Sequence, residues 1–406
     1  METGTIAPKS PRITIIDALR GFSLAGIVFA HMLEHFAGAP IPNEAVESMN
    51  PGLIDQIANA FVNIFFRGKF FALFSFLFGL SFFIQMDNAD QKGNSFSARF
   101  LWRLILLLVI GYVHSLFYRG DILTIYALCG VLLIPFYQIR SKWVIAVMAL
   151  LFLGLGRYIV FSFTNGDPLF LNEPFMPDSE KAAQYFELLK NGSLPAVFQS
   201  NAIEGHMVKM EAQFGIFSRG YLTFAFFLMG LLVGRIGLFK NFRERSALIK
   251  KSWITGLIMF VLAVGGMIGV FAALGPDSQF DNWLAMIGLT LFDLANVAMT
   301  IIIIAVFIIL YKKRKPHMFL QQFAPYGRMA LTNYVAQTIV GTAIFYGWGL
   351  GYLAQVRNSY VFLLAILVIT LQVWFSKWWL KRFRYGPLEW LWRSATFMKW
   401  YPMRRK

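Results

Sequence analysis

The chain is poor in cysteine and lacks several common catalytic motifs. Cys129 is the single cysteine among 406 residues and lies in the apolar run ILTIYALCGVLLIPF, where packing accounts for it. One cysteine excludes an internal disulfide framework and a multi-cysteine metal site. The sequence also lacks a Walker A loop, a G-x-S-x-G elbow, a Rossmann fingerprint and the HExxH zinc spacing. We therefore expect no metal.

Charge is also scarce, and this scarcity defines the class of protein. Only 14% of the residues are charged and 57% are hydrophobic, with a mean hydropathy of +0.58. These values are far from those of soluble domains and predict an all-α, polytopic integral membrane protein. The net charge of +16 does not indicate nucleic-acid binding, because the basic residues gather between the apolar segments. The first apolar segment has no small-residue cleavage pattern, so we expect it to be retained as a helix.

About ten apolar segments are long enough to cross a bilayer of roughly 30 Å. They cover residues 13–36, 69–86, 101–118, 121–137, 143–163, 214–236, 252–274, 283–311, 329–350 and 358–380. The lipid bilayer is thus the first expected partner. The segments fall into an N-terminal part, 1–240, and a C-terminal part, 241–406, which we expect to form one integrated membrane domain.

The charges of the loops predict the orientation. Lys9, Arg12 and the KKRK run at 312–315 fall on one side, together with the other basic loops, whereas the loops at 37–55 and 275–282 carry acids without Lys or Arg. The positive-inside rule then places both termini in the cytoplasm, with the chain in a bacterial inner membrane. The largest outer segment, 164–213, is expected to form a lid or rim.

The first apolar segment, IIDALRGFSLAGIVFAH, holds polar residues on one face. Arg20 and His31 are eleven positions apart, which on a helix is about 20° beyond three turns and a rise of roughly 16 Å. Asp17 and His35 fall on nearly the same face. Charges at the bilayer centre are costly, so this face should meet protein or water. Structural alternatives remain: Arg20 could pair with Asp17 or snorkel, and His31 could anchor at the interface.

The segment at 101–118 repeats this spacing. Arg103 and His114 are also eleven residues apart, with Arg99 one turn earlier. Two such helices could line one polar passage, in which the cations hold an anionic donor and the histidines meet an acceptor. Histidine suits proton transfer or brief acyl carriage because its pKa is near neutrality. Asp121 could orient a histidine, or it could cap the next helix.

Four further residues are candidates for substrate binding. They are His35, Lys69, Asp293 and Asn296. An acid within a membrane segment is a functional candidate by default, although a buried hydrogen bond to another helix explains Asp293 and Asn296 equally well. The run IEGHMVKME in the outer segment is interpreted as a solvated amphipathic helix.

Several motifs together resemble one family. IIDALRGFSLAGIVFAH, GKFFALFSFLFGLSFFIQ, HSLFYRGDILTIYALCG, YGRMALTNYVAQT and GPLEWLWR look like the YeiB-like bacterial membrane proteins, which carry the domain of unknown function 418. The first helix is similar to that of acyltransferase family 3 and of heparan-glucosaminide acetyltransferase relatives. That resemblance implies essential roles for Arg20 and His31, and it relates the paired arginines of the third helix to Arg99 and Arg103, at a spacing of four rather than three.

The leading hypothesis is a membrane acyltransferase. It would use cytoplasmic acyl-CoA, most simply acetyl-CoA, to acylate a hydroxyl or amine of an outer-face glycan, lipid or small molecule. His31, His114 and Asp121 would be catalytic, and Arg20, Asp17, Arg99 and Arg103 would bind the donor. A transporter of an anionic or amphipathic solute is the alternative, although the sequence indicates no inverted repeat of broken helices. A noncatalytic envelope scaffold is a third hypothesis, and a homo-oligomer is compatible with each.

Overall fold

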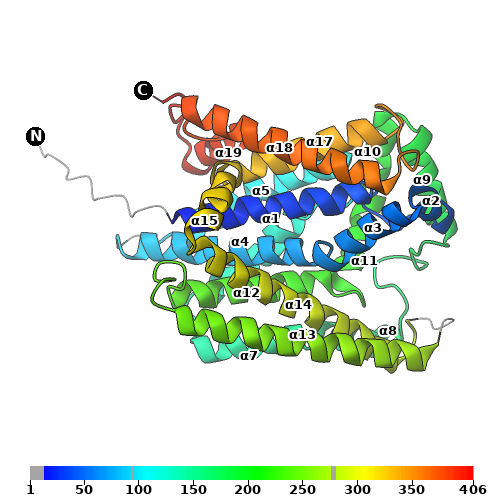
Figure 1. The fold of residues 1–406 in the computed structure, drawn as a ribbon, viewed down its shortest axis with the longest axis horizontal. Coiled ribbons are helices and arrows are strands. Elements are labelled where there is room, and N and C mark those ends of the chain that lie inside the picture. Colours follow the sequence, from blue (N-terminus) through cyan, green and yellow to red (C-terminus); the bar gives the residue numbers. More distant parts are fainter. Residues whose placement is uncertain (1–12, 94, 276–279, 406) are drawn as a thin grey trace, which may run out of the picture.

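The computed structural model describes residues 13–93, 95–275 and 280–405, and this part of the chain is all-α (Figure 1). Its β-structure is limited to one isolated bridge between Phe383 and Arg404. Lys9, Arg12 and residues 276–279 of the acidic loop lie outside the described residues. The chain enters α1 and ends after α19 at the same end of the bundle (Figure 1).

Six segments of the described chain are long and apolar enough to cross a membrane. They are α1 (Thr14–Leu33), the run of α3 (Leu53–Phe65) and α4 (Lys69–Asp90), α5 (Ser97–Phe117), α13 (Ser246–Leu274), α14 (Trp283–Tyr311) and α18 (Asn358–Arg382). Their apolar length explains why they form helices, because backbone groups in a bilayer must be satisfied within the segment.

Two further candidate spans are sharply bent. The pair α7 (Ser141–Phe152) and α8 (Leu155–Thr164) bends by 50°, and the pair α11 (Glu204–Phe214) and α12 (Arg219–Arg235) bends by 61°. Gly154 and Ser218 lie at the two breaks with φ of 84° and 57°. Counting each pair as one span gives up to eight candidates in the described residues. The sequence interpretation concerned an inverted repeat of broken helices and did not predict either bend, because it did not detect residues in the left-handed region within apolar runs.

The remaining helices are shorter. They are α2 (Asn43–Met49), α6 (Leu123–Phe136), α9 (Glu180–Asn191), α10 (Leu194–Ala202), α15 (Arg314–Leu320), the 3-10 turn η1 (Gln321–Phe323), α16 (Ala324–Arg328), α17 (Ala330–Phe345) and α19 (Pro387–Phe397). Two of the ten predicted segments, 121–137 and 329–350, correspond to α6 and α17, which have only 14 and 16 residues.

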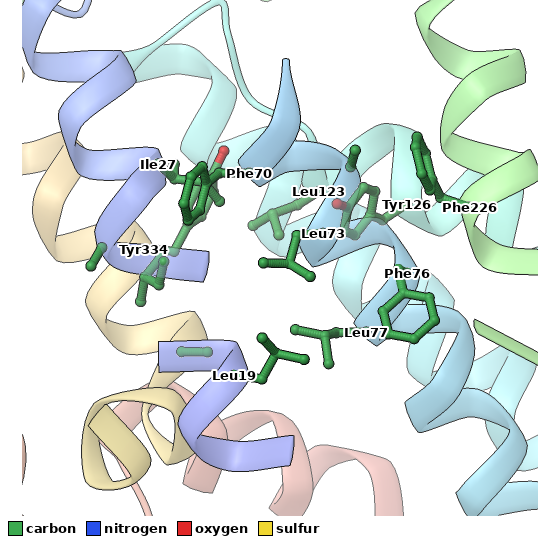
Figure 2. Close-up of a cluster of buried hydrophobic side chains, with 14 of the residues drawn as sticks. Leu19, Ile27, Phe70, Leu73, Phe76, Leu77, Leu123, Tyr126, Phe226 and Tyr334 are labelled. Carbon is green, nitrogen blue, oxygen red and sulfur yellow. The ribbon is translucent and has the colours of Figure 1, made fainter. Parts of the chain in front are cut away.

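Helix α1 lies at the centre of the bundle, between α4 and α18 (Figure 1). Figure 2 shows Leu19 on the α1 side and Leu73 and Leu77 on the α4 side of the core that separates these helices. Of the 20 residues of α1, 14 are buried. Burial on nearly all sides means that the polar side chains of α1 face other helices and not lipid.

The segment 164–213, which the sequence predicts to be the largest outer segment, contains α9, α10 and part of the bent pair α11–α12. Arg119, in the turn after α5, fixes this segment: its guanidinium donates to Asn201 and Ser200 and lies 3.4 Å from the centre of the Tyr185 ring. Glu204 completes an ion pair with Arg119 at 3.1 Å. The segment thus packs directly on the turn between α5 and α6.

The N-terminal and C-terminal parts meet where α1 crosses α16 without intervening side chains. A Cβ added at Gly21 would collide with the carbonyl of Phe323, and one added at Gly327 would collide with the carbonyl of Asp17. Small residues at such crossings let helix backbones approach closely, which is the usual packing of membrane helices. The backbone contact fixes α1 against the C-terminal part.

We expect Gly21→Ala to lower the free energy of unfolding by about 1–3 kcal/mol, because the new methyl overpacks a backbone contact. Gly265→Ala in α13 is the matched control, since no atom lies within 4 Å of the added Cβ. That control should be neutral or slightly stabilising, because alanine favours helix more than glycine does. Unfolding by SDS titration in mixed micelles measures both changes. Equal effects at the two glycines would contradict the packing described.

Candidate functional site

His31 lies in the last turn of α1 and faces aromatic rings. Its ring centroid is 5.1 Å from that of Tyr118, 5.4 Å from that of Phe36 and 6.3 Å from that of Tyr334. The Nδ1 atom is buried and has no hydrogen-bond partner among the described residues. His31 therefore keeps a free ring nitrogen in a largely apolar setting.

His114 and Asp121 form a buried pair at the C-terminal end of α5. The His114 Nδ1 atom lies 2.8 Å from the Asp121 Oδ1 atom, and both side chains are almost fully buried. A carboxylate only accepts hydrogen bonds, so Nδ1 carries the proton and Nε2 holds the lone pair of the neutral ring. In the described part of the chain Nε2 has no partner. The pair thus presents an oriented base.

Asp121 also begins the next helix. Its carboxylate accepts from the backbone N–H groups of Leu123 and Thr124 at 3.1 and 3.2 Å. Both roles weighed from the sequence, orienting a histidine and capping a helix, therefore occur in the same side chain.

Lys209 of α11 completes this cluster and was missed by the sequence interpretation. Its Nζ atom lies 3.6 Å from Asp121 Oδ2 and 3.3 Å from Thr124 Oγ1. The run IEGHMVKME is helical as predicted but is not simply solvated, because Gly205 and Lys209 are buried. His206 stacks on Tyr112 at 5.1 Å and contacts Ser115 at 3.1 Å. The four-residue spacing of Gly205 and Lys209 was the available signal for a buried face.

A cavity of about 160 Å³ adjoins His31. Its walls come from α1, α4, the turn before α6, α6, the two sides of the α11–α12 break, and α17. They are lined by Ile27, His31, Phe71, Gly120, Ile122, Tyr126, Gln213, Arg219 and Tyr334. Figure 2 shows Ile27, Tyr126 and Tyr334 in this region of the core.

The ring of Tyr334 links the two histidines. Its centroid lies 6.3 Å from that of His31 and 5.0 Å from that of His114. The structure therefore brings His31, His114 and Asp121 into one neighbourhood, as the shared spacing in the two helices predicted. The sequence interpretation did not predict three other residues of the cavity wall: Tyr334, Gln213 and Arg219. All three are far from His31 in the sequence, and the sequence does not fix how their helices rotate.

The predicted donor-binding residues lie elsewhere in the fold. Arg20 forms an ion pair with Asp17 at 3.2 Å and donates to Ser81 of α4 at 2.9 Å. Arg20 therefore forms the ion pair with Asp17 that was considered as the alternative to donor binding. Its side chain also links α1 to α4 through Ser81. Neither residue lines the cavity of His31.

Arg99 and Arg103 lie against α19. The Arg99 guanidinium is 5.1 Å from the ring centre of Phe397, and that of Arg103 is 4.3 Å from the ring of Trp392. Arg393, on the same helix as Trp392, lies close enough to Arg103 for their charges to repel. In the described residues no carboxylate pairs with these three arginines. They form a basic cluster flanked by aromatic rings, which we call the Arg99/Arg103/Arg393 cluster.

The four residues predicted to bind substrate do not line the cavity. Lys69 donates to the carbonyl of Asn63 at 3.1 Å, and Asn296 donates to the carbonyl of Phe292 at 3.0 Å. Asp293 pairs with Arg157 of α8, a fully buried side chain. The interhelical bond considered for Asp293 thus occurs as an ion pair.

His35 is buried beyond the end of α1. Its Nδ1 atom accepts from the backbone N–H of Ala354 at 3.1 Å, and its ring stacks on Phe345 with centroids 4.3 Å apart. These contacts make His35 a packed connector between the N-terminal and C-terminal parts.

Among the described residues, no group of three or more His, Cys, Asp or Glu side chains is arranged to hold a metal ion. The chemistry considered below uses histidine, carboxylate and arginine side chains.

Three known proteins are similar to almost the whole chain. YxaH of Bacillus subtilis is 31% identical over 418 aligned residues, which cover 97% of this chain and 96% of the relative. YeiB of Escherichia coli is 26% identical, covering 95% and 96%. The chain belongs to the YeiB-like family. A third YeiB-like relative, a 39.9 kDa protein encoded in the amylase 3' region of Bacillus acidopullulyticus, is 28% identical over 97% of this chain and 96% of its own length.

Two family models match successive parts of this YeiB-like chain. The catalytic region of heparan-alpha-glucosaminide N-acetyltransferase matches residues 12–189, and the protein of unknown function DUF418 matches residues 233–399. The first range, which is acyltransferase-like, holds His31, His114 and Asp121. Tyr334 lies in the second range, and Arg219 lies between the two.

Proposed function

We propose that this protein is a membrane-embedded acyltransferase, which transfers an acyl group from cytoplasmic acyl-CoA to a hydroxyl or amine at the outer face. The observation that carries the proposal is the His114–Asp121 pair with its free Nε2 atom, close to His31 and its cavity. The match to an N-acetyltransferase catalytic region favours acetyl-CoA as the donor. The acceptor belongs to one of three classes: a glycan, a lipid or a small molecule.

The reaction needs a proton acceptor and a proton donor. In the proposed step His31 takes the proton of the acceptor hydroxyl or amine, and the freed lone pair attacks the thioester carbonyl. A bond forms from acceptor oxygen or nitrogen to the acyl carbon, and the C–S bond breaks. The leaving CoA thiolate then takes this proton from His31. His114, oriented by Asp121, assists by accepting a hydrogen bond at Nε2.

The Arg99/Arg103/Arg393 cluster would hold the donor phosphates. Guanidinium groups bind phosphate through charge-assisted, bidentate hydrogen bonds, and aromatic rings can stack on an adenine. Arg103 and His114 are eleven residues apart on α5, a rise of about 16 Å. The extended arm of CoA would bridge this distance. Arg20 and Asp17 would act as positioning residues that fix α1 beside the passage.

The proposed topology has ten membrane segments, both termini in the cytoplasm and one integrated domain in the inner membrane. Cys129→Ala provides a background for single reporter cysteines. A reporter at residues 312–315 should react only with a permeant reagent in intact cells, and one at 164–170 should react with an impermeant reagent. Impermeant labelling at 312–315 would overturn the orientation and the cytoplasmic donor with it.

Turnover tests the enzyme proposal. Purified protein in nanodiscs should release CoA from acetyl-CoA, slowly by hydrolysis or faster once an acceptor is present. His31→Ala should abolish that release. His317→Ala is the matched control, because His317 lies in α15, packs its ring on Tyr311 of α14 and does not line the cavity. Equal release by wild type and His31→Ala, or no donor binding by the wild type, would refute the proposal.

One observation favours transport as a second function. Arg157 of α8 donates to the carbonyls of Ile216 and Phe217, at the break between α11 and α12. Two bent helices thus meet at a buried charge, and discontinuous helices often form the sites of transporters. Flux of an anionic solute in proteoliposomes, without any acyl transfer, would favour this function over the enzyme.

A further inference from the structure

Arg219 is a charged wall of the His31 cavity that neither the spacing of the motifs nor the matched family ranges single out. It is the first residue of α12, directly after Ser218, where α11 and α12 bend by 61°. The start of α12 therefore lies at the cavity. A guanidinium and the positive end of a 17-residue helix therefore meet the same space as His31.

The Arg219 guanidinium forms no ion pair with a carboxylate among the described residues. Its recorded contacts in the described chain are the ring faces of Phe71 and Phe292, at 5.8 and 5.9 Å. Contacts of this length replace little of the hydration that a cation loses in a membrane protein. The arrangement leaves the charge available to an anion.

The neighbouring acids are already engaged. Asp293 is within electrostatic range of Arg219 but pairs with Arg157. Glu34 pairs with Arg67 at 2.7 Å, and Asp121 pairs with His114. Lys69 is also within range of Arg219 and adds charge of the same sign. This side of the cavity therefore has a positive potential that the described side chains do not neutralise.

Other cavity atoms need a hydrogen-bonding ligand. Gln213 Oε1 and His31 Nδ1 are both buried, and neither has a partner among the described residues. The amide oxygen can only accept, so it requires a donor such as a hydroxyl or an amine. A ligand that satisfies this cavity of about 160 Å³ would therefore place an anionic group at Arg219 and a hydrogen-bond donor at Gln213 and His31.

We propose that the cavity binds a small anionic acceptor, an alcohol or amine that carries a phosphate or carboxylate, with its anionic group at Arg219 and its hydroxyl or amine at His31. The assignment of the hydroxyl or amine as the acyl acceptor rests on the proposed acyltransferase function. The cavity volume suits a single headgroup and not an extended glycan. The anion can come from a lipid headgroup or from a free solute, and the chemistry at Arg219 is the same for both.

Binding can be measured without any acyl transfer. The free-solute probe is sn-glycerol 1-phosphate, compared with uncharged glycerol, on protein in phosphatidylcholine nanodiscs by calorimetry and thermal unfolding. The lipid probe is phosphatidylglycerol within the nanodisc. Wild type should bind glycerol phosphate at least tenfold more tightly than glycerol, or should gain thermal stability from phosphatidylglycerol. The first result assigns the anion to a solute, and the second assigns it to a lipid.

Three variants locate the effect. Arg219→Gln should lose the preference for the charged probe, and Arg219→Lys should retain part of it. Arg140→Gln, an exposed arginine beside the opposite end of α12, should behave as wild type. If wild type shows no preference for either charged probe, or if Arg219→Gln keeps it, the inference is wrong. If the protein binds the charged probes selectively but transfers no acyl group, only the proposed enzyme is refuted. If it acylates uncharged acceptors and Arg219→Gln does not change that rate, only this inference is refuted.

Discussion

Asp121→Asn is expected to lower the rate of acyl transfer by about 100-fold or more, which is the usual contribution of an oriented acid–base residue. With its NH₂ group toward His114, the asparagine keeps its oxygen as an acceptor for Thr124, so part of the helix cap survives. Leu123, which shares Oδ1 with His114, loses its acceptor. The asparagine NH₂ group would donate to His114 Nδ1 and move the ring proton to Nε2. The histidine would then lose its lone pair at the position where the reaction needs it.

The measurement separates catalysis from folding. kcat for acetyl-CoA should fall while its KM changes little, and unfolding should show a separate loss of stability, because Lys209 loses its buried ionic partner. Asp121→Ala should lose the same activity and, in addition, about 1 kcal/mol of stability, because it also removes the helix cap. A rate for Asp121→Asn within threefold of wild type would show that Asp121 has only its structural role.

Arg157→Met is expected to lower the free energy of unfolding by about 3–5 kcal/mol, the cost of leaving one charge of a buried pair unmatched. Arg157 is about 1% exposed and donates to Thr290 and Ile216 at 2.8 and 2.7 Å, besides pairing with Asp293. Its loss leaves the Asp293 carboxylate and the carbonyls of the α11–α12 break without donors.

The double variant identifies the cause of this cost. Arg157→Met with Asp293→Leu removes both charges and should recover part of the stability, with only the backbone carbonyls left unsatisfied. Lys240→Met is the surface control, because Lys240 is about half exposed and lies 3.6 Å from Asp87. That change should cost about 1 kcal/mol or less. Equal losses for Arg157→Met and Lys240→Met in mixed-micelle unfolding would contradict a structural role for the buried pair.

The sequence predicted the helical class and the positions of the apolar segments well, because length and hydropathy decide both. It did not predict the breaks at Gly154 and Ser218, since each lies in a run that is apolar or helical on both sides. A φ of 57° at Ser218 depends on the tertiary contacts of Arg157 with the carbonyls at the break. Local propensity does not contain that information.

The sequence predicted only part of the candidate site, because the rest depends on tertiary contacts between distant helices. Spacing along one helix singled out His31 and His114, which both lie beside the ring of Tyr334, and the short distance in sequence linked His114 to Asp121. Arg219 and Tyr334 come from distant helices, and their contribution depends on how those helices rotate. The ion pair between Arg20 and Asp17 shows the opposite case, in which a residue that matches a motif makes a local structural contact.

The proposed path from donor to acceptor is tested most directly by labelled acetyl-CoA supplied to one side of sealed membrane vesicles. With inside-out vesicles, which expose the cytoplasmic face, wild type should move the acyl label into the lipid extract or the lumenal solutes. His31→Ala should leave the label on CoA, and right-side-out vesicles should show no transfer. Transfer by His31→Ala, or label that never leaves CoA with the wild type from either side, would contradict acyl transfer at the His31 cavity.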